Sequence, residues 1–310
     1  MVWGNINNCE IISKLKRPQG KIRLVLDTDA FNEVDDQYAI TYALKKQNRI
    51  SVESIYAVPF VNSRAATPKE GMELSEMEIK NVLSLLEREE MFNRIFKGST
   101  GFLEDENTPR ESDAAYDLVK RANALSENEI LYVAAMGAIT NIASALLIDP
   151  SIRDKIVVIW LGGHEHHWKD TKEFNLIQDV AATRVVFNSG VPIVQIPCNG
   201  VASHLIISES ELREHMKSKS RIGDYLYQIT CEINANSKTS CWSRTIWDLS
   251  TVMWLAGPKE AMSCHFTYSP VVSYEGYYSV NHERHFIKVV DWLDRDKIFD
   301  EFFTIISLSE

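Results

Sequence analysis

Short apolar runs alternate with longer amphipathic segments along the first two thirds of the chain. The apolar runs are rich in Val, Ile and Leu on both faces, a pattern typical of strands covered on both sides. They comprise residues 22–26, 52–58, 130–134, 156–161 and 191–196. The segments between them predict helices at residues 35–46, 75–90, 112–124, 140–148 and 179–188. This alternation predicts an α/β fold with a mostly parallel, doubly wound, Rossmann-like sheet and helices on both faces.

Local signals refine two helix ends. Ser75, followed three residues later by Glu78, predicts a capping box that begins a helix at residue 75. The pair Asp149-Pro150 predicts the end of the helix over residues 140–148. No Pro/Gly/Ser-rich linker or internal repeat divides the sequence, so we expect residues 1–310 to form a single domain with a less regular C-terminal third.

Composition and charge narrow the class of protein. Of the 310 residues, 45% are hydrophobic and 25% are charged, which is typical of a soluble globular chain. The net charge of -10 and the lack of a Lys/Arg run argue against a nucleic-acid partner. The N-terminus shows no leader pattern and no apolar stretch is long enough to span a bilayer, so we expect a cytoplasmic protein without a membrane partner. The five cysteines include no CxxC pair and predict neither a disulfide framework nor a thiolate zinc site.

Four aspartates gather where the first predicted strand ends. Asp27 and Asp29 close the strand, and Asp35 and Asp36 open the helix that follows. Carboxylates at such close range repel one another unless a cation or hydrogen bonds compensate them, and oxygen ligands favour Ca²⁺ or Mg²⁺. The alternative is purely structural, because acidic residues also stabilise the N-terminus of a helix. The clustering of all four residues favours a metal site.

The stretch Asp27-Thr28-Asp29, followed by Asp35-Asp36, resembles the signature of the inosine-uridine nucleoside hydrolases. In this chain the turn between the two aspartate groups is two residues longer than in the usual family pattern. Further resemblances follow in the family's order, over about residues 22–255: Val58 to Asn62, Met136 to Asn141, Gly162-Gly163, Glu173-Phe174-Asn175 and Trp247-Asp248.

The resemblance implies two sets of site residues in an enzyme that hydrolyses ribonucleosides. The metal, expected to be Ca²⁺, would be bound by Asp29, Asp36, Asp248 and the backbone carbonyl of Met136. The ribose hydroxyls would be bound by Asp35, Asn62, Glu173 and Asn175. Asp29 would also act as the base that takes a proton from water, since a carboxylate beside a metal can accept that proton. From the residues alone, an exposed loop pair is the better interpretation of Glu173 and Asn175, and the order of the motifs reverses that preference.

The residues that would contact the leaving base are less well defined. Trp247 stands where many relatives carry a histidine; an indole is a poor acid but can stack on a purine, so we predict a catalytic role for Trp247. The resemblance implies a purine preference, because relatives with tryptophan at this position prefer purines. The alternative is that Trp247 is a core residue. The run of residues 164–167, His-Glu-His-His, does not have the spacing of a zinc protease motif. We expect these histidines to line the substrate pocket, with His167 contacting substrate and one of them able to act as the leaving-group acid.

Three hypotheses follow for the activity. The first is metal-dependent hydrolysis of a ribonucleoside, with purines favoured, to ribose and free base. The second is hydrolysis of another or modified glycoside at the same metal site, motivated by the longer turn. The third is a non-catalytic, metal-dependent nucleoside-binding protein. The resemblance also implies a homodimer or homotetramer.

Overall fold

The computed structural model describes residues 3, 7–235, 239 and 241–307, and an eight-stranded sheet runs through them. The strand order is β3-β2-β1-β4-β5-β6-β12-β9, and every neighbouring pair is parallel except β12 and β9. The strands are β1 (Ile22–Thr28), β2 (Ile50–Ala57), β3 (Ile95–Lys97), β4 (Leu131–Ala135), β5 (Ile156–Leu161), β6 (Ile193–Ile196), β9 (Met262–Tyr268) and β12 (Phe286–Leu293). The predicted mostly parallel, doubly wound sheet is confirmed.

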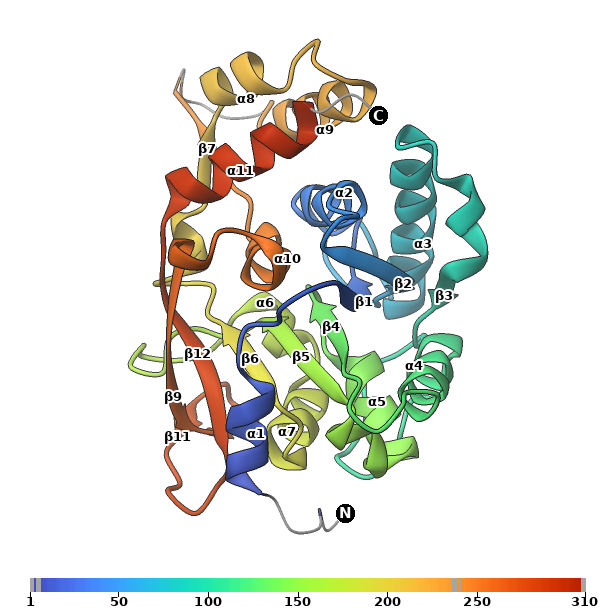
Figure 1. The fold of residues 1–310 in the computed structure, drawn as a ribbon, viewed down its shortest axis with the longest axis vertical. Coiled ribbons are helices and arrows are strands. Elements are labelled where there is room, and N and C mark those ends of the chain that lie inside the picture. The colour runs from blue at the N-terminus through green and yellow to red at the C-terminus, as the bar shows by residue number, and fades with distance from the viewer. Residues whose placement is uncertain (1–2, 4–6, 236–238, 240, 308–310) are drawn as a thin grey trace.

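Helices cover both faces of the sheet (Figure 1). One face carries α2 (Asp36–Lys45), α3 (Pro68–Leu85), α10 (Leu249–Ala256) and α11 (Arg295–Ser307). The other carries α4 (Asp113–Asn123), α5 (Thr140–Ile148) and α7 (Val180–Ser189). Short 3-10 turns at Glu89–Arg94, Pro150–Asp154, Ala202–His204 and Lys259–Ala261 complete several connections, and α1 (Asn8–Lys14) packs against β12.

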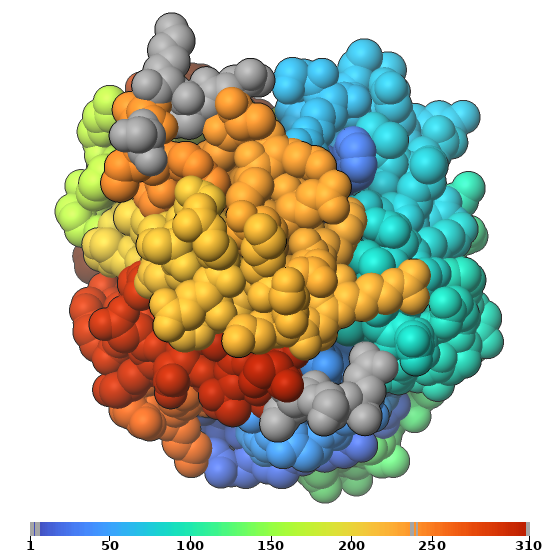
Figure 2. Space-filling view, turned by 90° about the horizontal axis from the view of Figure 1, so that it is seen from above, coloured from blue at the N-terminus to red at the C-terminus, as the bar shows by residue number. Residues whose placement is uncertain are grey.

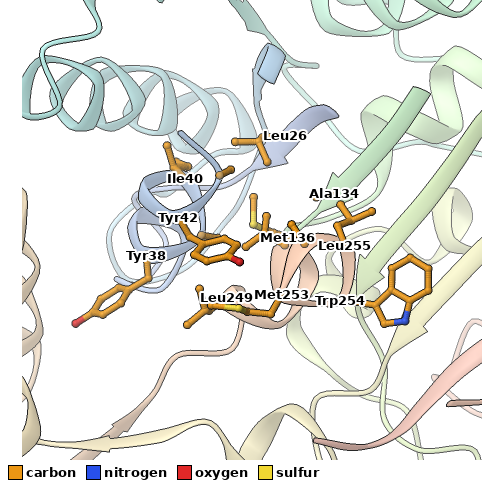
Figure 3. Close-up of a cluster of buried hydrophobic side chains, with 14 of the residues drawn as sticks. Leu26, Tyr38, Ile40, Tyr42, Ala134, Met136, Leu249, Met253, Trp254 and Leu255 are labelled. Atoms are coloured by element: carbon orange, nitrogen blue, oxygen red, sulfur yellow. The ribbon is translucent and has the colours of Figure 1, made fainter. Parts of the chain in front are cut away.

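Each strand contributes side chains to two cores because successive residues point to opposite faces. In β1, Leu24 and Leu26 belong to the core beneath α2 and α10, whereas Val25 belongs to the core beneath α4, α5 and α7. Figure 3 shows part of the first of these cores, to which Leu26 of β1, Tyr42 of α2 and Met253 of α10 contribute. The apolar character of both faces of β1 is therefore explained by helices on both sides.

The C-terminal third adds structure beyond the five predicted strands. β12 and β9 extend the sheet, and two small ladders pair β7 (Ile206–Ser208) with β8 (Ser243–Thr245) and β10 (Val271–Val272) with β11 (Tyr278–Ser279). Helices α8 (Glu209–His215) and α9 (Arg221–Ile233) lie beside α11 at one end of the molecule, as Figure 2 shows in yellow, orange and red. His215 of α8 stacks on Phe303 of α11, with ring centroids 4.3 Å apart.

The helix predicted over residues 75–90 does not begin at residue 75. Helix α3 begins at Pro68, and the side chain of Thr67 caps it by accepting a hydrogen bond from the Glu70 amide. Ser75 lies inside the helix, where its hydroxyl donates to the Gly71 carbonyl at 2.9 Å. The predicted stop at Asp149-Pro150 is confirmed, because α5 ends at Ile148.

The sequence predicted neither a disulfide framework nor a membrane-spanning segment. All five cysteines are free thiols, as their spacing predicted. Among the described residues, none of the helices is both long enough and apolar enough to cross a bilayer.

Candidate active site

Most of the predicted site residues gather at the carboxyl ends of the central strands. β1 pairs with β2 on one side and with β4 on the other, so the winding of the sheet reverses between β1 and β4. Ligands of open α/β sheets bind at such a reversal. Asp29 follows β1, Met136 follows β4, and Asp248 precedes α10 at the same edge.

Asp35, Asp36 and Asp248 form the centre of the acidic cluster. One oxygen from each lies within 4.8 Å of the others, and all three side chains are buried. Asp36 is the first residue of α2 and Asp248 immediately precedes α10, so the N-termini of two helices point their positive ends at the cluster. The Asp36 carboxylate accepts a hydrogen bond from the Thr28 hydroxyl, and the Asp248 backbone amide donates to Asp35 at 3.3 Å.

Burial raises the pKa of each carboxyl in the cluster. It is the main cause of the raised pKa of Asp29, and the charges of Asp36 and Asp35 raise that pKa further. Burial also raises the pKa of Asp36, to about 6, and the pKa values of Asp35 and Asp248 well above the usual range. The interaction between Asp36 and Asp248 lowers the pKa of Asp36 and raises the pKa of Asp248, so it opposes the effect of burial at Asp36 and adds to it at Asp248.

Asp29 has the environment expected of a metal ligand. Its side chain is 1% exposed, and neither carboxylate oxygen has a hydrogen-bond partner among the described residues. A Cβ atom added at Gly137 would lie 2.9 Å from the Asp29 carboxyl carbon, so the backbone after β4 approaches this carboxylate closely because residue 137 is glycine. A buried carboxylate without donors is costly unless a cation neutralises it. The residues present therefore fit a hard divalent cation.

Met136 is the first residue after β4, and it lines a cavity that opens above this cluster. The Met136 backbone carbonyl accepts a hydrogen bond from the Asn175 side-chain amide at 3.0 Å, and the same amide donates to the Leu161 carbonyl at 3.0 Å. A carbonyl oxygen has two lone pairs, so the Asn175 contact leaves one for a cation. Asn175 is buried and holds the ends of β4 and β5 together.

Hydrogen bonds to both carboxylate oxygens hold the Glu173 side chain in place. It caps α6 (Phe174–Gln178), accepting from the backbone amides of Asn175 at 2.8 Å and Leu176 at 3.1 Å. The Gly163 amide donates to it at 2.8 Å, and the Cys198 thiol forms a further hydrogen bond. Burial raises the pKa of Glu173, although these donors oppose the shift. Glu173 is thus a buried, preorganised acceptor rather than an exposed loop residue.

A cavity of about 450 Å³ opens over these groups, which is large enough for a nucleoside. Asp35, Asn62, Met136, Glu173, Asn175, Trp247 and Asp248 line it, and Asp29 and Asp36 lie buried beneath. Trp247 is partly buried and precedes α10, so it forms part of the wall while also contacting the core.

The histidine loop contributes one residue to the cavity, and it is not the predicted one. His164 lines the wall and contacts Asn199, whereas the side chain of His167 is 75% exposed and faces Glu165. His166 points into the protein, with its ring nitrogen 2.8 Å from the Gln195 side-chain oxygen. Burial lowers the pKa of His164, which favours the neutral form of this ring.

The longer turn after Asp29 forms a second part of the wall, which the sequence did not reveal. Asn32 and Glu33 line the cavity. The Asn62 amide, predicted to contact ribose, donates to the Asn32 side-chain oxygen at 2.7 Å. Arg244 of β8 forms an ion pair with Glu33. The longer turn therefore brings new polar groups to the site.

Other wall residues were also missing from the predicted set. Cys198 and Asn199 follow β6 and line the cavity together with Lys172 and Leu161. Their position after a predicted parallel strand was the available signal, because the carboxyl ends of parallel strands meet at one edge.

Comparison with known proteins agrees with this geometry. The family described as inosine-uridine preferring nucleoside hydrolase matches residues 24–300. The pyrimidine-specific ribonucleoside hydrolase RihA of Escherichia coli O81 (strain ED1a) is 25% identical over 263 residues, covering 76% of this chain and 80% of RihA. A putative pyrimidine-specific ribonucleoside hydrolase, RihB of Shigella boydii serotype 4 (strain Sb227), is 40% identical over 74 residues, which are 23% of this chain and 30% of RihB.

Solved structures share the fold. An inosine-guanosine nucleoside hydrolase superimposes with a TM-score of 0.73 at 16% identity, covering 93% of this chain and 99% of that one. The family match extends over most of the chain and includes the strand end, the turns and the helix start that form the cavity. This chain belongs to the inosine-uridine preferring nucleoside hydrolase family and is an N-glycosyl hydrolase.

Proposed function

We propose that the protein cleaves the N-glycosidic bond of a ribonucleoside, with a preference for purines, using Ca²⁺ and Asp29 to activate the attacking water. The observation that supports this most directly is the pair of buried Asp29 oxygens, without partners among the described residues, beside the cluster of Asp36 and Asp248. Asp29, Asp36, Asp248 and the Met136 carbonyl would hold the cation. When bound, the cation supplies a positive charge that lowers the pKa of water and orients it.

Asp29 then takes the proton from water as the water oxygen bonds to the anomeric carbon of ribose. The bond to the base breaks, and the departing base nitrogen keeps the electron pair and takes a proton from solvent, while Asp29 returns the proton it took from water to solvent. Because the sugar becomes oxocarbenium-like, fixed carboxylates close to it stabilise the transition state. Asp35, Glu173 and Asn175 line the cavity, where they can hold the ribose hydroxyls. Asn62 would reach the sugar together with Asn32, to which it is hydrogen-bonded.

A ribose-release assay over a panel of purine and pyrimidine nucleosides tests this function. We expect ribose and free base in equal amounts from at least one purine nucleoside in the presence of Ca²⁺. The named relatives differ in base, since RihA is pyrimidine-specific and the structural relative is an inosine-guanosine hydrolase. Release from pyrimidine nucleosides alone would contradict the purine preference and leave the reaction itself intact.

Trp247 carries the proposed preference, since it lies in the cavity wall. Stacking of a base on an aromatic ring contributes about 1–3 kcal/mol. We therefore expect Trp247→Ala to lower kcat/KM for the best purine nucleoside by roughly 5- to 150-fold. Trp247→Phe should retain most of the activity, since it keeps an aromatic face.

Trp168→Ala serves as the matched control, because Trp168 is 42% exposed and lies outside the cavity wall. Equal losses of kcat/KM for purine and pyrimidine nucleosides in Trp247→Ala would show that the ring supports the fold and does not select the base.

A second candidate function is hydrolysis of a modified nucleoside or another glycoside at the same centre. The longer turn favours it, because Asn32 and Glu33 add polar groups to the cavity wall. Absence of ribose from every common nucleoside, with product from a modified one, would select this candidate. Tight nucleoside binding in calorimetry without any product would instead indicate a binding protein.

A further inference from the structure

The hairpin that carries β10 and β11 packs against the loop that precedes Glu173. The Thr171 backbone amide donates to the Gly276 carbonyl at 2.8 Å, which joins hairpin and loop. Within the hairpin, the Ser273 amide donates to the Tyr277 carbonyl at 2.9 Å. Tyr278 follows and points inward, with its ring centroid 4.8 Å from that of His166 and its hydroxyl inside the protein.

The Tyr278 hydroxyl belongs to a polar network centred on Gln195 of β6. The Gln195 side-chain nitrogen donates to this hydroxyl at 2.8 Å and to the Gly162 carbonyl at 2.9 Å. The Gln195 oxygen accepts from the His166 ring at 2.8 Å, so both ends of the amide have partners and its orientation is fixed. Tyr278 and Thr171 share a further hydrogen bond. Since Gln195 is completely buried, losing one partner leaves a donor unsatisfied.

This network meets the active site at Gly162 and Gly163. Gly163 has a φ of 73°, and a Cβ atom there would lie 2.1 Å from the Tyr278 oxygen, so the hydroxyl packs directly on the glycine. The Gly163 amide donates to Glu173 at 2.8 Å, and its carbonyl accepts from the Cys198 amide at 2.9 Å. The peptide between the two glycines therefore connects the hairpin to the carboxylate proposed to bind the sugar.

We propose that Tyr278 is a positioning residue that acts through Gln195 and the Gly162-Gly163 backbone to hold Glu173 in place for the ribose. This inference rests on the proposed function of the cavity. Tyr278 lies outside the cavity wall. Its hydroxyl fixes the peptide whose amide orients Glu173, and small displacements of such a group weaken transition-state contacts. The hairpin thereby gains a role in the reaction that its exposed tyrosines alone do not suggest.

A double-mutant cycle of Tyr278→Phe with Glu173→Gln tests the proposal. Tyr278→Phe keeps the ring that packs on His166 and removes the hydroxyl alone. We expect this variant to lower kcat/KM about tenfold. It loses one buried hydrogen bond of the network that positions Glu173, the carboxylate proposed to bind the ribose. In the Glu173→Gln background, Tyr278→Phe should lower kcat/KM by less than about twofold, because the effects of two coupled residues are not additive.

Tyr274→Phe is the control, because it removes a hydroxyl from the same hairpin whose partner is Glu106, at 3.2 Å, on the protein surface. It should leave kcat/KM unchanged. Equal losses from Tyr278→Phe in both backgrounds, or no loss at all, would overturn the positioning role while the wild-type chain still releases ribose. A wild-type chain that turns over no glycoside would overturn both this inference and the proposed function.

Discussion

Replacing Asp29 by asparagine is expected to reduce kcat by about a thousandfold, within the range that a general base contributes. The asparagine side chain keeps the shape of aspartate but cannot accept the proton that Asp29 would take from water, and the substitution removes one charge from the proposed cation site. The measurement is ribose release at saturating nucleoside and saturating Ca²⁺, so that weaker binding of either does not account for the loss.

The fold of the Asp29→Asn variant should remain intact. In the cation-free protein both Asp29 oxygens are buried without donors among the described residues, so the charged carboxylate opposes folding. We therefore expect the unfolding midpoint of this variant in chelator to equal or exceed that of the wild type. Asp300→Asn, on the exposed surface of α11, is the matched control and should retain full activity. Full activity in Asp29→Asn would refute its assignment as the base.

The central part of the sheet could be predicted because β1, β2, β4, β5 and β6 are largely apolar on both faces. Residues 156–161 coincide with β5, since helix side chains cover that strand on each side. β12 escaped prediction because its residues alternate between buried and partly exposed positions. β12 pairs with β6, a strand that lies far earlier in the sequence. That pairing depends on tertiary contacts, which the periodicity of a single segment does not encode.

The missed start of α3 has a local physical cause. Ser75 and Glu78 have the spacing of a capping box, yet both side chains are buried in the middle of the helix. Glu78 instead accepts a hydrogen bond from the Tyr225 hydroxyl at 2.5 Å. The pair Thr67-Pro68 carries the true signal, a capping side chain followed by proline in the first turn.

The acidic half of the site was more predictable than its walls. Asp29, Asp35 and Asp36 lie on one strand end, turn and helix start, so their proximity follows from local structure. The wall combines the ends of several strands, and which loop residue faces inward depends on how each loop folds. His164 rather than His167 reaches the cavity because the loop turns after Gly163, which adopts a positive φ.

Removing the cation with a chelator is expected to abolish turnover and to lower the unfolding midpoint, by more at pH 8 than at pH 5.5. Burial raises the carboxyl pKa values of the cation-free cluster, with the pKa of Asp36 at about 6. A carboxyl with a raised folded pKa binds more protons when folded. Its contribution to stability is therefore present at acidic pH and is lost as the pH rises through the folded pKa. The cation offsets the charges that then appear, so its stabilising effect should grow with pH.

The magnitude follows from mass action. Free Ca²⁺ at about a hundred times its dissociation constant adds about 2.7 kcal/mol, which corresponds to a shift of roughly 4 °C for a chain of this length. Calorimetry with and without Ca²⁺ at each pH measures this difference. His285, whose pKa burial lowers to about 4, has the opposite pH dependence, but it contributes equally to both samples and cancels. Asp248→Asn should lose most of the shift, so an unchanged shift in that variant would place the cation elsewhere.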